Sequence, residues 1–362
     1  MSSMLEIQNY RQTAAGDSIE ISVKGKWVRV PALHVNGRAI IVRGKWVKKA
    51  IIDAEEWLES EIDDPELCIR KLQEQRSHAL RADIFTFSQK VPAISPKYGY
   101  PMEWQSVAAV RVTNFKDWWD KLPQETRKNV RRSQKRGVVV SVKTFDDELI
   151  NGIIDVNNDS AVRQNLPFAH YGKTFEQVRR DQSTFLNRSE FICAYLQSEM
   201  IGFVKIVYRG EVASILQILP RASHYDKRPA NALIAKAVEL CEVRGISYLT
   251  YGMFNYGNKR DSSLLEFKIR NGFDEILVPK FYVPLTLWGS FCLRMKLHRG
   301  LLGVLPPRAI TVAVRARARW YDLKQRISRC SSMSERSTCN RQMGRSNPPA
   351  GSNTLTRIEP GS

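Results

Sequence analysis

The sequence is poor in the residues that build metal and redox sites. Its 362 residues include five scattered histidines and six cysteines without a CxxC spacing. This pattern argues against a metal site and against a disulfide framework. Cys193 and Cys241 lie inside apolar strand and helix patterns, where we expect reduced thiols in a core.

Long apolar segments are also lacking. No run of about 18 apolar residues is present, which argues against a membrane-spanning helix. Residues 1–11 lack the apolar centre of a signal peptide. We therefore expect a cytoplasmic protein. Hydrophobic residues make up 43% of the chain, which is ordinary for a globular protein.

Positive charge is concentrated in two segments. Of the formal net charge of +19, residues 294–362 carry +11, from 14 Lys and Arg against 3 Asp and Glu. Residues 121–136 carry +6, from 7 against 1, which leaves only +2 for the rest of the chain. Localised positive charge predicts an anionic partner, such as nucleic acid, an anionic membrane surface or an anionic acceptor substrate. A solvated tail explains the C-terminal charge equally well.

The first 104 residues are expected to form an N-terminal extension with a hairpin and helices. Residues 29–35 and 38–42 are β-rich runs around Asn36-Gly37, a strong hairpin signal. The repeated Gly-Lys-Trp-Val at 25–28 and 44–47 indicates either a basic-aromatic binding surface or, with more support, tryptophans packed across a sheet. We expect helices at 53–60 and 65–81 and a strand at 83–87. Residues 88–104 should form a packed loop, with a role in lining an acceptor site or in structure alone.

A basic helix and a polar-aromatic loop stand out between residues 105 and 200. We expect a strand at 107–112, a helix capped by Asn114, a helix at 123–136, a strand at 138–142 and helices at 146–158 and 175–186. The basic helix contains Arg127, Arg131 and Arg132, and arginine favours bidentate phosphate contacts. In the loop before residue 175, His170 is the histidine suited to move a proton and Tyr171 is placed to contact an acceptor. A surface role for His170 is the simpler alternative.

Residues 201–285 have a distinctive order of elements. Two strands at 201–207 and 212–219 are followed by a helix at 230–244, a strand at 247–251, a helix at 262–271 and a strand at 273–283. Four segments in and before this region carry a resemblance: residues 121–137, residues 225–233, Tyr251-Gly252 and residues 266–273. Together they resemble the GNAT superfamily, and in detail its Fem-type branch, over roughly residues 115–285.

The resemblance implies a GNAT-like α/β fold, with a mixed twisted sheet flanked by helices. It also implies that strands 212–219 and 247–251 splay apart around an acyl donor, and that the next helix offers its first amides to the donor phosphates. The family pattern R/Q-x-x-G-x-G/A aligns with residues 226–231, where both glycines are absent. Acetyl-CoA or another acyl-CoA is the usual donor, whereas Fem-type enzymes use aminoacyl-tRNA. The candidate donor-binding residues are Gln217, Asp226, Lys227, Arg228 and Asn231.

Acyl transfer needs a group that stabilises the oxyanion and groups that move protons. Tyr251 is a candidate general acid, although a core tyrosine is an ordinary reading of that position. Lys268 is a candidate partner for a phosphate or an oxyanion. Glu266 is a candidate general base, yet on a helix it diverges from Lys268 by roughly 200°.

The predicted function is N-acyl transfer by a core at residues 105–285. An acyl or aminoacyl group would move to an amino group, and the resemblance suggests a cell-envelope or polysaccharide precursor as acceptor. The alternative is a non-catalytic protein that binds nucleic acid or an anionic membrane surface. Residues 286–327 form a basic amphipathic segment suited to peripheral membrane contact, and residues 328–362 are predicted to be disordered. No oligomeric state is predicted.

Overall fold

The computed structural model describes residues 18–23, 26–53, 61–75, 77–163, 166–255 and 263–299. The chain divides into two compact units, residues 1–294 and 295–362. Of the second unit, only residues 295–299 are described, with a short 3₁₀ helix, η3 (Leu297–Arg299). The expected helix at 53–60 and the expected disordered tail lie outside the described residues. The remaining account concerns the first unit.

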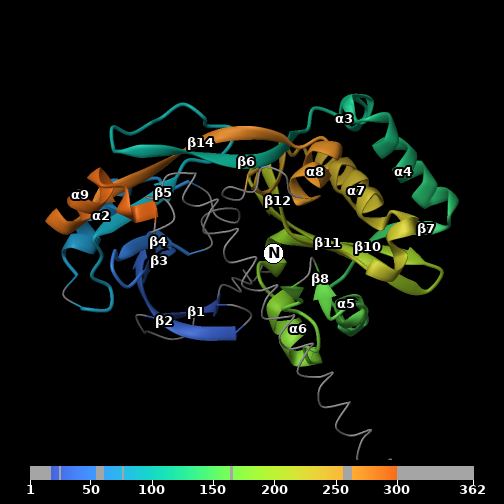
Figure 1. Ribbon diagram of the computed structural model, residues 1–362, viewed down its shortest axis with the longest axis horizontal. Helices are drawn as coiled ribbons and strands as arrows, with labels where there is room; N and C mark the ends of the chain where they lie inside the picture. The colour runs from blue at the N-terminus through green and yellow to red at the C-terminus, as the bar shows by residue number, and fades with distance from the viewer. Residues whose placement is uncertain are drawn as a thin grey trace, which may run out of the picture. The chain divides into compact units, whose positions relative to one another are not determined.

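The first unit is built on one mixed sheet of twelve strands, in the order β1-β2-β3-β4-β5-β14-β6-β13-β12-β11-β10-β7 (Figure 1). The strands are β1 (Ser18–Val23), β2 (Lys26–Val35), β3 (Arg38–Arg43), β4 (Lys49–Ile52), β5 (Ile84–Ser88), β6 (Met102–Arg111), β7 (Val138–Lys143), β10 (Ser189–Leu196), β11 (Glu199–Arg209), β12 (Val212–Pro220), β13 (Tyr248–Met253) and β14 (Asp274–Pro284). Two short strands, β8 (Val162–Arg163) and β9 (Leu166–Pro167), pair separately. The C-terminal strand β14 lies between β5 and β6, so the N-terminal strands and the C-terminal strands belong to one continuous sheet. The boundary expected at residue 104 falls inside β6.

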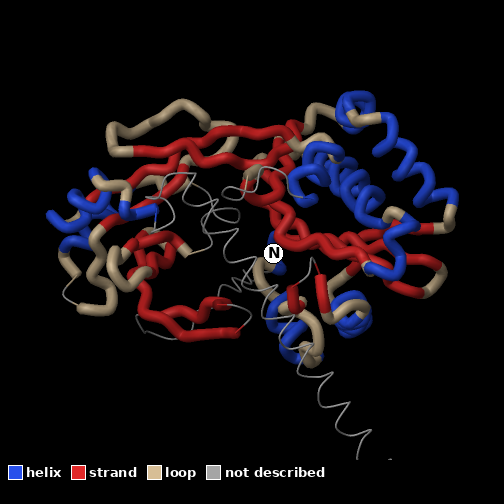
Figure 2. The backbone as a smooth tube through the Cα atoms, viewed as in Figure 1, coloured by secondary structure: helices blue, strands red, loops and turns tan. Residues whose placement is uncertain are grey.

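Helices cover both faces of the C-terminal half of the sheet (Figure 2). The helices of the described ranges are α2 (Pro65–Gln73), α3 (Phe115–Lys121), α4 (Gln124–Lys135), α5 (Asp147–Asn158), α6 (Phe175–Gln182), α7 (Pro229–Val243), α8 (Ser263–Arg270) and α9 (Leu287–Arg294), with 3₁₀ turns η1 (Leu186–Arg188) and η2 (Ala222–Lys227). Of these, α2 packs against the N-terminal half of the sheet and α9 against β14. Ile192 and Val204 pack with α7, whereas their neighbours Phe191 and Phe203 pack with α5 and α6. The alternation of side chains along each strand therefore separates an α7 face from an α5–α6 face.

One arrangement of elements occurs twice in this sheet. The antiparallel strands β10, β11 and β12 are followed by a crossover containing α7 and by β13, which is parallel to β12. The antiparallel strands β2, β3 and β4 are followed by a crossover containing α2 and by β5, which is parallel to β4. The sequence did not predict this second copy, because β4 is only four residues long.

Local signals in the sequence account for many element boundaries. The hairpin between β2 and β3 is confirmed, with positive φ values at Asn36 (48°) and Gly37 (72°), the type I′ geometry that Asn-Gly favours. Asn114 caps α3 as expected, and Asp146 caps α5, which begins one residue after the predicted start. The helix expected to reach residue 186 ends at Gln182, since Phe185 has a left-handed φ of 59°.

The helix expected at 65–81 was too long. α2 ends at Gln73, because the following polar residues provide no apolar face that would continue it. The expected core thiols are confirmed: Cys193 and Cys241 are free and buried, and burial raises the pKa of each to about 12. No helix in the described ranges is both long enough and apolar enough to cross a membrane.

Candidate functional site

The parallel strands β12 and β13 separate soon after they start. They pair only where Val212–Ser214 lies beside Tyr248–Thr250, although β12 continues to Pro220 and β13 to Met253. Leu216 is the extra residue of a bulge opposite Lys205 and Ile206, and it is 38% exposed despite its place in a central strand. The expected splay between these strands is therefore confirmed.

The Tyr251-Gly252 pair forms a second bulge at this opening. Along β6, Thr250 pairs with Ala109 and Met253 pairs with Val107, so two residues of β13 oppose one residue of β6. Gly252 has a φ of 61°, a conformation that residues with a Cβ rarely adopt. This glycine allows β13 to turn away from β12.

The start of α7 lies where the resemblance places the donor phosphates. Arg228 is the N-cap residue, with φ 58° and ψ 40°, and Pro229 supplies no amide. The amides of Asn231 and Ala232 lie 3.2 and 3.5 Å from the Arg228 carbonyl oxygen, so they turn inward. Pro229 therefore removes one of the first-turn amides that could bind an anion, and side-chain cations must supply most of the attraction.

The left-handed conformation of Arg228 gives a stability prediction. Arg228→Gly should raise the free energy of unfolding by about 1 kcal/mol, because glycine adopts a positive φ without steric cost. Lys227→Gly, one residue earlier and inside η2, is the matched control and should lower stability instead. Urea unfolding of both variants checks the pair; a loss of stability in both would show that the Arg228 side chain itself stabilises the fold.

The predicted basic helix, α4, packs beside α7. Arg136, just after α4, donates hydrogen bonds to the main-chain carbonyl of Asp226 and, at 3.3 Å, to its carboxylate. The Lys227 ammonium lies 3.0 Å from the same carboxylate. These cations hold the Asp226 carboxyl pKa below its usual value. Asp226 is therefore an exposed anion paired with cations at the start of α7, which is unsuited to direct contact with phosphate.

Three arginines of α4 were predicted to bind phosphate. Arg131 lies over the Trp119 ring, with its guanidinium carbon 5.5 Å from the ring centroid. Arg132 donates to Asn129 at 3.1 Å and lies 3.8 Å from the Glu125 carboxylate. Arg127 is partly buried on the same helix. Their phosphate-binding role stays a prediction.

Two predicted donor ligands hold structural elements together. The Asn231 amide donates to the Asn271 side-chain oxygen at 3.0 Å, which ties α7 to the end of α8. The Gln217 side-chain oxygen accepts from the Gln182 amide at 2.8 Å, which ties β12 to α6. The donor-binding roles of Asn231 and Gln217 stay predictions.

The predicted catalytic residues of α8 diverge as expected. Lys268 is fully buried, with its Nζ 2.6 Å from the Met253 carbonyl oxygen and 4.8 Å from the centre of the Tyr251 ring. Burial lowers the Lys268 pKa to about 8. Glu266 is exposed and paired with Arg270. Lys268 therefore fixes the end of β13 at the opening, whereas Glu266 points to solvent.

Tyr251 stands at the edge of the opening, on the second bulge. It is partly buried and packs with Phe273, with 6.0 Å between the ring centroids. Tyr251 follows Thr250, the last residue of β13 that pairs with β12, so it is the predicted catalytic residue nearest along the chain to the point where the strands separate.

His170 and Tyr171 lie on the loop before α6, which covers the other face of the sheet. His170 Nδ1 lies 3.3 Å from Lys173 Nζ, and Lys173 in turn pairs with Asp181 at 2.5 Å. Burial and the neighbouring ammonium lower the His170 pKa. Tyr171 is about half exposed. The structure therefore does not bring these two residues together with Lys268 and Tyr251.

Lys205 is a functional candidate that the sequence analysis missed. Its side chain is fully buried in β11, and Nζ donates to the carbonyl oxygens of Gln182 and Thr184, each at 2.6 Å. Desolvation lowers its pKa to about 7. Lys205 pairs with Gln217 in the sheet register, next to Leu216, the extra residue of the β12 bulge. A lysine in the middle of an apolar strand was the available signal.

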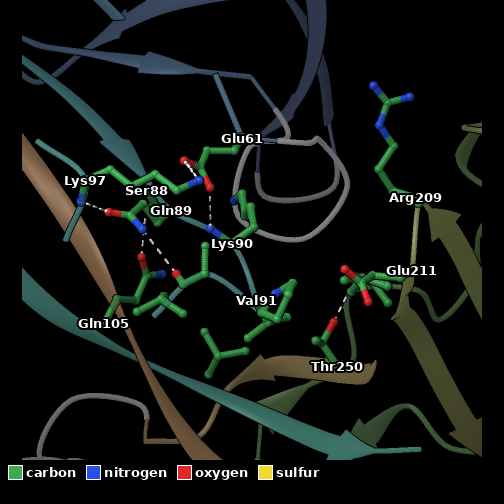
Figure 3. A pocket seen from close by; sticks show the side chains of 17 residues that line it. Glu61, Ser88, Gln89, Lys90, Val91, Lys97, Gln105, Arg209, Glu211 and Thr250 are labelled. Atoms are coloured by element: carbon green, nitrogen blue, oxygen red, sulfur yellow. Dashed lines mark hydrogen bonds and ion pairs between the residues drawn. The ribbon is translucent and has the colours of Figure 1, made fainter. Parts of the chain in front are cut away.

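A pocket of about 490 Å³ adjoins the last paired residues of β12 and β13 (Figure 3). Ser214 and Thr250 line it, with their side-chain oxygens 2.8 Å apart. Glu61, Gln89 and Lys97 contribute from the N-terminal half of the unit. Along β12 the pocket is lined by Val212 and Ser214, whereas the intervening Ala213 packs in the core with α7. Because side chains alternate between the two faces of a strand, the pocket lies on the α5–α6 face of the sheet.

The pocket contains charges of both signs. Glu61 pairs with Lys97 at 2.8 Å, and Arg209 and Glu211 come from the turn between β11 and β12. Across the described ranges, the Glu211 carboxylate has no ion-pair partner. Gln89 is fully buried and holds the loop after β5 by bonds to Ala93 and Ser95, so the expected packed loop is confirmed. No cluster of His, Cys, Asp or Glu in the described part of the chain is arranged to bind a metal ion.

Comparison with solved structures identifies the fold. No protein-family model and no curated protein matches the sequence. FemX superposes with a TM-score of 0.50 at 10% identity, over 73% of this chain and 89% of FemX. The C-terminal DUF2156 domain assigned to a lysylphosphatidylglycerol synthetase from Agrobacterium fabrum also gives 0.50, at 14% identity, over 73% of this chain and 87% of that domain. The chain therefore shares the α/β fold of FemX and of this DUF2156 domain.

Proposed function

We propose that this protein is an aminoacyltransferase that moves an aminoacyl group from aminoacyl-tRNA to an acceptor amino group. The observation that carries the proposal is the opening between β12 and β13, which has the cations that follow α4 and precede α7 at one end and the pocket on the α5–α6 face. A donor and an acceptor that approach from different sides of one sheet can meet in such an opening.

The chemistry at the start of α7 favours aminoacyl-tRNA over acyl-CoA. Pro229 and the inward amides of Asn231 and Ala232 make a poor cradle for a compact pyrophosphate. Seven Lys and Arg residues at 121–136 instead suit a long polyanion, whose binding depends on many dispersed side-chain cations. The name of the lysylphosphatidylglycerol synthetase domain also concerns transfer of an aminoacyl group. Acetyl-CoA remains the alternative donor.

The proposed reaction is attack of an acceptor amine on the ester carbonyl of the donor. The new carbon–nitrogen bond forms, the ester carbon–oxygen bond breaks, and the terminal ribose hydroxyl of tRNA leaves. The Glu211 carboxylate is suited to bind the acceptor ammonium and take its proton. Tyr251, on the rim of the opening, is our candidate to protonate the leaving oxygen. An amine of a cell-envelope precursor is the acceptor class we propose.

Donor binding tests the proposal through the cations of α7. Lys227→Ala/Arg228→Gly should weaken binding of aminoacyl-tRNA by about tenfold to a hundredfold, since two phosphate partners are lost. Glycine adopts the positive φ of residue 228 without steric cost, so a change in binding cannot be attributed to backbone strain introduced by the substitution. Lys71→Ala/Lys116→Ala removes the same charge at exposed ion pairs elsewhere and should bind as the unaltered protein does. Equal weakening in both variants would exclude a specific site at α7.

A non-catalytic nucleic-acid-binding protein is the second candidate, favoured by the same basic helix and by the absent glycines. It predicts equal affinity for charged and uncharged tRNA, binding that falls steeply with salt, and no turnover. The aminoacyltransferase instead predicts consumption of the ester. Comparing the rate of deacylation with and without the protein and an amine acceptor distinguishes the two.

A further inference from the structure

We infer that α9 and the turn between β3 and β4 form one docking surface for an anionic lipid bilayer. This docking surface consists of Trp46, Leu287, Trp288 and Phe291. The fractions of these side chains that are exposed are 79%, 92%, 47% and 49%, respectively. Large apolar side chains grouped at the surface of a folded protein usually mark an interaction site.

The helix α9 has an unusual distribution of side chains. Its buried positions are Gly289 and Cys292, whereas Leu287, Trp288 and Phe291 occupy its exposed side. The rings of Trp288 and Phe291 stack with their centroids 5.5 Å apart. A surface helix normally presents its polar face to solvent. The apolar side chains on the exposed side of α9 do not pack in the core, so core packing does not account for them.

The docking surface is held in a fixed shape. The Trp288 indole donates to the Trp46 carbonyl oxygen at 3.0 Å, which joins the two segments across 242 positions of sequence. Thr286 donates to Asp83 at 3.1 Å at the start of α9. A Cβ on Gly289 would lie 1.9 Å from the Asp83 carbonyl oxygen, so α9 packs closely on the chain before β5. The Trp288 side chain and the main chain at Trp46 consequently lie together.

Charge complementarity selects a lipid surface as the occupant. Residues 43–48 and 287–294 contain four Lys and Arg residues and no Asp or Glu: Arg43, Lys45, Lys48 and Arg294. The chain then continues into residues 295–362, with 13 Lys and Arg against 3 Asp and Glu. Tryptophan prefers the headgroup level of bilayers, and nearby cations attract anionic lipids. A bilayer matches both the aromatic and the basic character.

Flotation of the full chain with vesicles tests this inference in the absence of any acyl donor. The vesicles contain phosphatidylcholine with or without roughly one-third phosphatidylglycerol, and salt is set at about 0.1 M or about 1 M. We expect binding to the anionic vesicles at both salt concentrations, because high salt screens the basic tail but not apolar insertion. Trp46→Ser/Leu287→Ser/Phe291→Ser should bind at least about thirtyfold more weakly at high salt.

Trp104→Ser is the matched control, since Trp104 is exposed on β6 outside the docking surface. It should float as the unaltered protein does. Three outcomes would overturn the inference: no flotation of the unaltered protein at high salt, equal flotation of the triple variant, or self-association through these residues without vesicle binding. Far-UV circular dichroism establishes that the triple variant is folded. Because no donor is present, the result is independent of the proposed transfer reaction.

Discussion

Lys205→Met is expected to lower the free energy of unfolding by about 2 to 4 kcal/mol at pH 9. The substitution keeps most of the apolar stem but removes the group that donates to the carbonyl oxygens of Gln182 and Thr184. Each buried acceptor left without a donor costs about 1 to 3 kcal/mol. Lys143→Met, at a partly exposed lysine of β7, is the matched control and should change stability by less than about 1 kcal/mol.

The effect of Lys205 should also depend on pH. Its pKa is about 7 in the folded protein and about 10.4 in an unfolded chain. Between these values the unfolded state binds more protons, so the contribution of Lys205 to stability rises with pH, by at most about 1.4 kcal/mol per unit. Below pH 7 both states are protonated and the slope disappears. The stability difference between the unaltered protein and Lys205→Met should therefore grow from pH 7 to 10, and a constant difference would contradict the burial account.

Lys268→Met is expected to destabilise the fold by about 1 to 3 kcal/mol, because the partly buried Met253 carbonyl oxygen loses its donor. Since the ammonium holds the end of β13 beside the opening, the same variant should also weaken donor binding. Urea unfolding and tRNA binding measure the two effects. The folded pKa of about 8 adds a rise in stability with pH above that value, which the variant should lack.

Glu266→Gln is the control for this second prediction, because Glu266 lies on the exposed side of the same helix. It should leave both stability and binding nearly unchanged. If Lys268→Met impaired transfer at full stability and full donor affinity, Lys268 would act on the reacting groups instead of positioning β13. A larger loss of stability or of donor affinity in Glu266→Gln than in Lys268→Met would contradict the buried, β13-fixing role of Lys268.

Local chemistry made much of the fold predictable. The Asn36-Gly37 turn and the cap at Asn114 each depend on residues adjacent in sequence, and each was confirmed. The order of strands and helices after residue 200 likewise follows from local periodicity. The insertion of β14 between β5 and β6 was not predictable in this way, because it depends on pairing between residues more than 150 positions apart.

The candidate site was predictable only in part. The basic helix and the cations before α7 were visible as charge, and the structure brings Arg136 and Lys227 to one carboxylate. The partners of Lys268 and Lys205 were not visible, because each ammonium binds main-chain oxygens of a distant element. Main-chain oxygens leave no residue-specific signal in a sequence. The pocket was missed for a related reason, as its lining comes from both ends of the unit.

The most direct test of the central claim is turnover of an aminoacyl-tRNA carrying a labelled aminoacyl group, with an amine-containing envelope extract as acceptor. The proposed aminoacyltransferase predicts protein-dependent transfer of the label from tRNA to an amine. Lys227→Ala/Arg228→Gly should reduce this transfer, whereas Lys71→Ala/Lys116→Ala should not. Tight tRNA binding with no loss of the ester at any acceptor concentration would contradict the claim and would leave a nucleic-acid-binding protein on a GNAT-like fold.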